Sequence, residues 1–147
     1  MKTVLDKSTR DELISRINKL SENSAVQWGR MNVYQMVKHC TLWEEMTSGR
    51  NKYKRAFIGR LFGKIAMRTL LKNEDPMPRN APTIPELRVT GTGDLAAEKK
   101  KWVALLEEYE HFSNTDLVHP FFGKMTREQT GYLAYKHTDH HLRQFNS

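Results

Sequence analysis

Apolar residues recur at the spacing of an α-helix in five stretches of this 147-residue chain, and this periodicity restricts the fold more than any other feature. The first stretch places Leu13 and Ile17 on one face of a helix that should begin near Ser8. No segment alternates apolar and polar residues between hairpin turns, as paired strands do. The chain is therefore predicted to be all-α, and its length fits a single domain over residues 1–147.

Local signals mark where the helices should begin and end. Asn32 with Gln35, and Thr126 with Gln129, are capping-box pairs, in which each side chain hydrogen-bonds the backbone amide of the other residue. Gly49 is a natural stop for the second helix because glycine readily adopts the left-handed conformation that ends a helix. Four long helices are expected to begin near residues 8, 32, 94 and 126.

Two further segments separate the second long helix from the third. Residues 54–72 are basic and amphipathic and predict a shorter helix. Residues 73–93 contain four prolines, each of which removes a backbone donor and disfavours helix in the residue before it. They predict a long loop, and long ordered loops are often functional lids. The predicted architecture is a four-helix bundle with an additional basic helix and a proline-rich loop.

Composition excludes several classes of protein. The single cysteine, Cys40, rules out an intrachain disulfide and a cysteine-rich metal cluster. No apolar stretch approaches the roughly 20 residues of a membrane span, and the first twelve residues lack the apolar core of a signal peptide. We therefore expect a cytoplasmic protein in which any metal site is built mainly from nitrogen and oxygen ligands.

The net charge of +7 comes from one segment. Residues 49–73 contain eight basic residues and no acid, so the remainder of the chain has a net charge of −1. Helix 54–72 could therefore contact an anionic membrane or nucleic acid as a non-catalytic interaction module. We favour the alternative that it packs on the bundle with its basic side in water, and nothing else resembles a nucleic-acid motif. Gly59 and Gly63 would allow close helix packing, including in a homodimer.

The histidines are the main candidates for chemistry. His137 and His141 lie one turn apart on the inward face of the last helix, a spacing that lets two imidazoles bind one cation. His39 lies among apolar residues of the second helix and could supply a third ligand from a facing helix. His140 falls at the boundary of the inward face, either beside the ligands or exposed. The alternative is that these are hydrogen-bonded core histidines.

Other polar residues are weaker candidates. Glu44 is the nearest acidic group and hence the candidate general base, although pairing with a cation at the bundle rim is the simpler expectation. Gln144 shares the face of the histidine pair and could contact a ligand. His119, in a loop before Pro120, could reach the mouth of a pocket but is expected to be solvated. Cys40 is expected to fill the core.

Three segments resemble the DinB-like, or YfiT-like, metalloenzymes: MNVYQMVKHC at 31–40, HPFFGKMTREQTGYLAYK at 119–136 and HTDHHLRQF at 137–145. The resemblance runs from about residue 25 to the end, whereas the basic helix and the proline-rich loop match only in layout. It implies an up-down four-helix bundle with three histidine ligands, one on the second helix and two as HxxxH on the last. These positions correspond to His39, His137 and His141.

The resemblance also implies a class of function. Three histidine ligands leave coordination positions open, which is the pattern of a catalytic site. Zinc suits neutral imidazoles and is the expected ion, while ligand type leaves nickel, manganese, iron and cobalt open. The implied activity is metal-dependent transfer or isomerisation with a low-molecular-weight thiol, or hydrolysis, acting on a small molecule.

Overall fold

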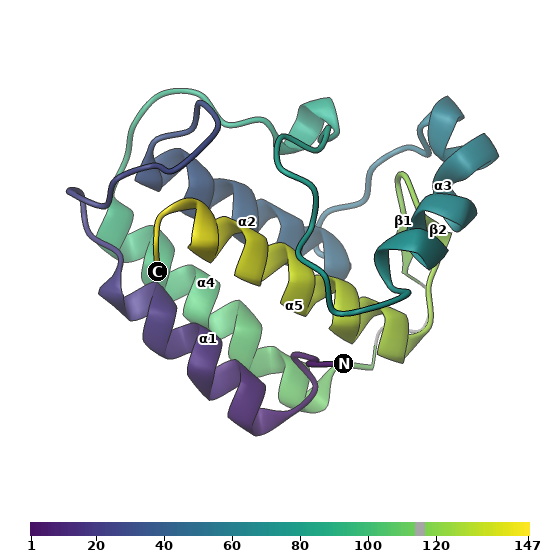
Figure 1. Ribbon diagram of the computed structural model, residues 1–147, viewed down its shortest axis with the longest axis horizontal. Helices are drawn as coiled ribbons and strands as arrows, with labels where there is room; N and C mark the ends of the chain where they lie inside the picture. Colours follow the sequence, from purple (N-terminus) through teal and green to yellow (C-terminus); the bar gives the residue numbers. More distant parts are fainter. Residues whose placement is uncertain (114–116) are drawn as a thin grey trace.

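The protein is a bundle of helices with one short hairpin, as seen in a computed structural model that describes residues 1–113 and 117–147 (Figure 1). The all-α prediction is therefore confirmed. The elements are α1 (Lys7–Lys19), α2 (Val33–Thr47), α3 (Phe57–Leu70), the 3₁₀ turn η1 (Pro85–Leu87), α4 (Leu95–Glu107), the 3₁₀ turn η2 (Glu108–His111), β1 (Val118–His119), β2 (Gly123–Lys124) and α5 (Arg127–Gln144).

Helices α1, α2, α4 and α5 form the bundle, with α2 packed against α4 and α5, and α1 packed against the same two helices. Lys38 pairs with Glu98 near the starts of α2 and α4, and Tyr109 reaches Glu44 near their ends, so these two helices run parallel. Both run antiparallel to α1 and α5 (Figure 1). The connection through α3 and the proline-rich loop produces this order, because it returns the chain to the end where α2 began.

The predicted capping boxes are confirmed. Gln35 donates its backbone N–H to Asn32 Oδ1 at 2.8 Å, and Gln35 Oε1 accepts from the Asn32 amide at 3.0 Å. Thr126 and Gln129 form the same reciprocal pair before α5. Helix α1 begins at Lys7, one residue from the predicted start near Ser8, and has no side-chain cap.

Helix α5 packs against α1 and α2, and most of its residues after the first turn are buried. The burial extends to two charged side chains on the side away from His137 and His141. Lys136 is buried and donates to the main-chain oxygen of Asp75 at 2.8 Å. Asp139 is also buried and pairs with Arg16 and Arg143, each at 2.7 Å. Of the charged residues after the first turn of α5, Arg143 is the exposed one.

Helix α3 stands away from the bundle and rests on the β1–β2 hairpin (Figure 1). Its glycine side faces the hairpin, where a Cβ at Gly59 would lie 2.5 Å from the Phe121 oxygen and one at Gly63 would overlap the same oxygen. The opposite, apolar side is 57–74% exposed at Phe57, Ile58, Leu61, Phe62 and Ile65. The prediction that this helix packs its apolar face on the bundle is therefore wrong.

The hairpin itself was not predicted, because two residues per strand are too few to show alternation. No helix in the described ranges is long and apolar enough to cross a bilayer.

Candidate metal centre

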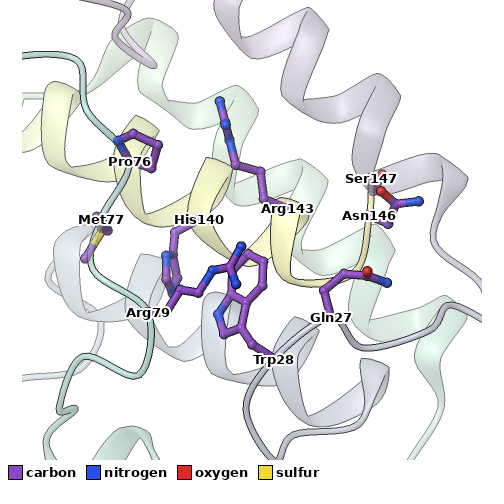
Figure 2. Close-up of a pocket in the computed structure, with 9 residues that line it drawn as sticks. All are labelled: Gln27, Trp28, Pro76, Met77, Arg79, His140, Arg143, Asn146 and Ser147. Carbon is purple, nitrogen blue, oxygen red and sulfur yellow. The ribbon is translucent and has the colours of Figure 1, made fainter.

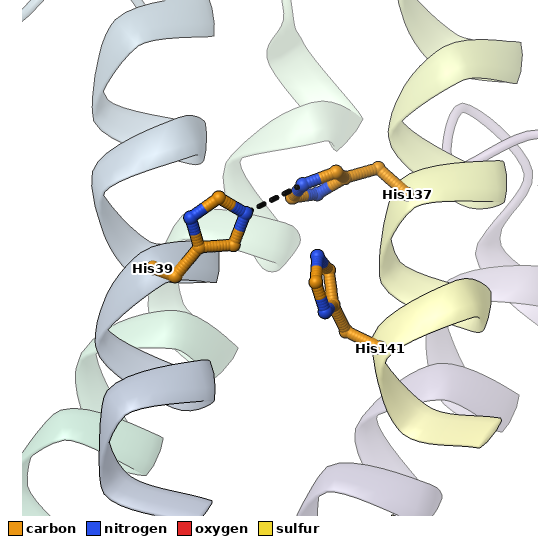
Figure 3. A group of neighbouring side chains, drawn as sticks. All are labelled: His39, His137 and His141. Atoms are coloured by element: carbon orange, nitrogen blue, oxygen red, sulfur yellow. Dashed lines mark hydrogen bonds between the residues drawn. The ribbon is translucent and has the colours of Figure 1, made fainter. Parts of the chain in front are cut away.

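Three histidines from two helices meet in the bundle core. His39 of α2 and His137 and His141 of α5 point toward one another, and one nitrogen from each lies within 4.8 Å of the others (Figure 3). The Nε2 atoms of His39 and His137 are 3.2 Å apart. All three side chains are buried, with 5–7% of their surface exposed. The structure thus brings together the three residues that the sequence singled out as ligands.

The orientation of the His39 ring is set by the proline-rich loop. Its Nδ1 lies 2.8 Å from the main-chain oxygen of Leu87, in the 3₁₀ turn η1. A carbonyl oxygen can only accept, so Nδ1 carries the hydrogen and neutral His39 has its lone pair on Nε2. That lone pair faces His137.

His141 is held in the same tautomer by a side chain. Its Nδ1 donates to Gln144 Oε1 at 2.9 Å, and Gln144 Nε2 donates to the Trp28 oxygen at 2.8 Å, which fixes the orientation of the amide. Gly29 makes this approach possible, since its φ is +84° and an added Cβ would lie 2.6 Å from Gln144 Nε2. Gln144 therefore contacts one of the three histidines and orients it.

His137 is positioned by an aromatic ring. The Trp43 indole stacks on its imidazole, with ring centroids 4.6 Å apart and planes inclined by 19°. Its Nδ1 is buried and has no hydrogen-bond partner among the described residues. With the hydrogen on this nitrogen, the Nε2 lone pair of His137 faces the same space as that of His39, which is the form that ligand binding needs.

Burial lowers the pKa of all three histidines, and for His137 the nearby His141 and His39 lower it further. The rings are therefore neutral at pH 7, which is the form that binds a metal. Tetrahedral zinc with Zn–N bonds of about 2.05 Å separates ligand nitrogens by about 3.4 Å. The 3.2 Å between His39 and His137 is close to this value, so the donor set fits a divalent transition metal.

His140 lies beside the cluster and is only 8% exposed. Of the two positions that the sequence left open, beside the ligands or exposed, it occupies the first. Its ring centroid is 5.1 Å from that of His141 and 5.6 Å from that of Trp28. Burial lowers its pKa, and a hydrogen bond with the Met77 backbone partly opposes that shift. On its outer side is a cleft of about 430 Å³, also lined by Trp28 and Arg79 (Figure 2).

The other candidates lie outside the three-histidine cluster. Glu44 is 1% exposed and hydrogen-bonds Tyr109 and Thr47 without an ion-pair partner in the described parts of the chain, so the expected cation is absent there. His119 is buried in the hairpin, contrary to the expectation that it is solvated, and its Nδ1 accepts from the amides of Phe121 and Phe122. Cys40 is fully buried, as predicted.

Sequence reasoning missed three groups around the site. The Leu87 contact uses a backbone oxygen, which gives no side-chain signal, although the proline content of its loop indicated a functional segment. Trp43 occurs one turn after His39 on the same inward face and could have been recognised from this spacing. Trp28 lies in a loop where no periodicity applies.

The fold and the cluster define a class: a helical bundle with a buried three-histidine cluster, of the kind found in the DinB/YfiT-like superfamily. The chain belongs to a family of proteins of unknown function, DUF1569, whose model matches residues 1–147 and which is related to that superfamily. No curated protein and no solved structure matches the chain.

Proposed function

We propose that this protein is a metal-dependent enzyme that uses His39, His137 and His141 as ligands and acts on a small molecule. The observation that supports it is the pair of fixed tautomers. Leu87 and Gln144 each hold an Nδ1–H, which directs the Nε2 lone pairs of His39 and His141 into a buried space shared with His137. Neutral nitrogen donors turned toward one point form a cation site.

Bound there, a divalent ion would lower the pKa of a coordinated water or thiol and polarise an electrophile. The residues of this chain orient the ligands and exclude water from the site. Trp43 covers one face of His137, and the helices keep the cluster buried. Zinc is the expected ion, with nickel, manganese, iron and cobalt as alternatives. Transfer to or from a low-molecular-weight thiol, or hydrolysis, is the proposed reaction class.

Metal analysis of the purified protein tests the proposal. We expect about one transition-metal ion per chain, retained on dialysis and lost in His137→Ala. His111→Ala is the matched control, because His111 is exposed and lies outside the cluster. Wild-type protein that is purified without metal and takes up neither added zinc nor added nickel would refute the metal site.

A second function is favoured by the exposed face of α3. Five large apolar side chains project into solvent, and on a helical wheel Arg60, Lys64 and Arg68 follow one edge of this face. We propose that α3 rests on an anionic lipid surface, where the apolar face enters the bilayer boundary and the cations meet lipid phosphates. Nucleic acid would leave the apolar face in water, and a second copy would bring two basic segments together.

Vesicle sedimentation tests this second function. We expect binding to phosphatidylglycerol vesicles that weakens with salt and is lost in the double variant Leu61→Ser, Phe62→Ser. Val26→Ser, at an exposed apolar residue outside α3, should bind as the wild type does. Equal binding by all three proteins would refute the proposal, as would a dimer in analytical ultracentrifugation that the double variant abolishes.

A further inference from the structure

The cleft beside His140 has a strongly cationic lining. Its volume is about 430 Å³, a size suited to a small organic molecule. Arg79 and Arg143 line it together with His140, Trp28, Gln27 and Asn146, and none of the described side chains that line it is acidic. Figure 2 shows Arg79 lying across the Trp28 indole with His140 beside them. A cleft of this composition suits an anion.

Arg79 is poised for such an anion. Its guanidinium lies 4.4 Å from the Trp28 ring centroid, a cation–π contact that fixes the group and leaves its in-plane N–H donors available. No carboxylate pairs with Arg79 within the described residues. A guanidinium held flat on an aromatic ring is well arranged for bidentate binding of a carboxylate or phosphate.

The second cation is only partly neutralised. Arg143 donates from Nε to Asp139, and this carboxylate is shared with Arg16. Arg143 lines the rim of the cleft, and Figure 2 shows its guanidinium directed away from Trp28 and Arg79. Arg16 itself donates to the Ser147 main-chain oxygen at the rim. The local balance around the cleft therefore stays positive.

The cleft is physically joined to the three-histidine cluster. Trp28 forms its wall and accepts through its main-chain oxygen from Gln144, which orients His141. His140 forms another part of the wall and packs edge-on against the His141 ring. A molecule in the cleft would thus touch the two residues that separate it from the proposed metal ligands.

We propose that this cleft binds the anionic group, a carboxylate or a phosphate, of the substrate on which the three-histidine site acts, with Arg79 as the main contact. This inference rests on the proposed function for its link to catalysis, but anion binding by the cleft is measurable without metal.

Nuclear magnetic resonance of the indole N–H groups provides the test. The chain has three tryptophans, and Trp28→Phe assigns the signal from the cleft. We expect glutarate or inorganic phosphate at millimolar concentration to shift the Trp28 signal saturably, and the neutral glutaramide to leave it unchanged. Arg79→Gln should weaken this binding about tenfold or more, whereas Arg60→Gln on α3 should not.

The outcomes separate the two proposals. Saturation by glutarate or by phosphate supports the cleft site, and the tighter ligand identifies the head group. No saturable shift in the wild type, or equal affinity in Arg79→Gln and Arg60→Gln, would overturn it. If the wild-type protein binds the anion but takes up no metal, the cleft proposal is supported and the proposed metal-dependent function is refuted. If the protein takes up metal but does not bind the anion, the metal site is supported and the cleft proposal is refuted.

Discussion

Tyr109, in the turn η2 that follows α4, donates its hydroxyl hydrogen to the buried Glu44 Oε2 of α2 at 2.7 Å. The second carboxyl oxygen of Glu44, Oε1, is buried without a hydrogen-bond partner in the described structure. Burial raises the pKa of Glu44 to about 8, and the hydrogen bonds from Tyr109 and Thr47 only partly oppose this. Glu44 is therefore mostly protonated at pH 7, in a position that packs two helices together.

Glu44→Gln should stabilise the protein at neutral pH. Between pH 4.5 and about 8 the unfolded chain ionises Glu44 while the folded chain keeps the proton, so folding stability falls as the pH rises. This effect amounts to about 3 kcal/mol at pH 7, and the glutamine variant removes it. Urea unfolding at pH 5 and pH 7.5 should show that the advantage of the variant grows with pH. Glu110→Gln, at an exposed position, is the control. If both variants show the same dependence on pH, Glu44 is not the group that is protonated in the folded protein.

The histidine cluster should have the opposite effect in acid. The pKa of His137 is lowered well below 6.5 by burial, so below pH 6.5 the unfolded chain binds a proton that the folded chain does not. Stability should fall as the pH falls through this range. His137→Gln should reduce the slope by up to about 1.4 kcal/mol per pH unit, measured by urea unfolding of chelator-treated protein. If the free energy of unfolding depends on pH in the same way in the variant and the wild type, His137 is protonated in the folded protein as readily as in the unfolded chain, which would contradict the prediction.

Gln144→Leu should weaken zinc binding about 10- to 100-fold, because His141 loses the acceptor that holds its Nδ1–H. Competition with a chromophoric chelator measures the affinity. Gln27→Leu is the matched control, since within the described residues the Gln27 side chain bonds only the nearby Ala25 oxygen. An affinity unchanged by Gln144→Leu would mean that the amide does not orient the ligand.

Gly63→Ala should detach α3 from the hairpin. In most helices this change is stabilising by up to about 1 kcal/mol, but here the new methyl group would overlap the Phe121 oxygen. Hydrogen exchange should accelerate in residues 57–70 and stay unchanged in α2 and α5. Thr69→Ala, at an exposed site on the same helix, should not accelerate exchange. Slower exchange in Gly63→Ala would contradict the prediction and would mean that the hairpin backbone moves to accommodate the methyl group.

Features encoded by neighbouring residues were predictable from the sequence. The capping boxes at Asn32 and Thr126 depend on side chains three positions apart, and the inward face shared by His137 and His141 depends on helical spacing alone. His39 was placed opposite them by its apolar surroundings and by resemblance to a known family. These patterns and the resemblance predict which three rings meet, but not how the His39 ring is oriented.

Features that depend on distant backbone were not predictable. The apolar face of α3 has the pattern of a core face, yet the glycine side is buried because it alone can approach the Phe121 backbone closely. Leu87 contributes a main-chain oxygen, and Glu44 meets Tyr109 only because α2 and α4 run parallel. Sequence periodicity carries no information on such pairings.

His39 and His137 are 98 positions apart in the sequence, and this separation has a consequence for folding. A site assembled from such distant residues exists only after the chain has closed a large loop, so metal would bind late and select the completed bundle. Once bound, the ion would act as a cross-link between the two ends of that loop. Its loss would reopen this connection between distant parts of the sequence, and resistance to unfolding would then depend on metal supply as well as on sequence.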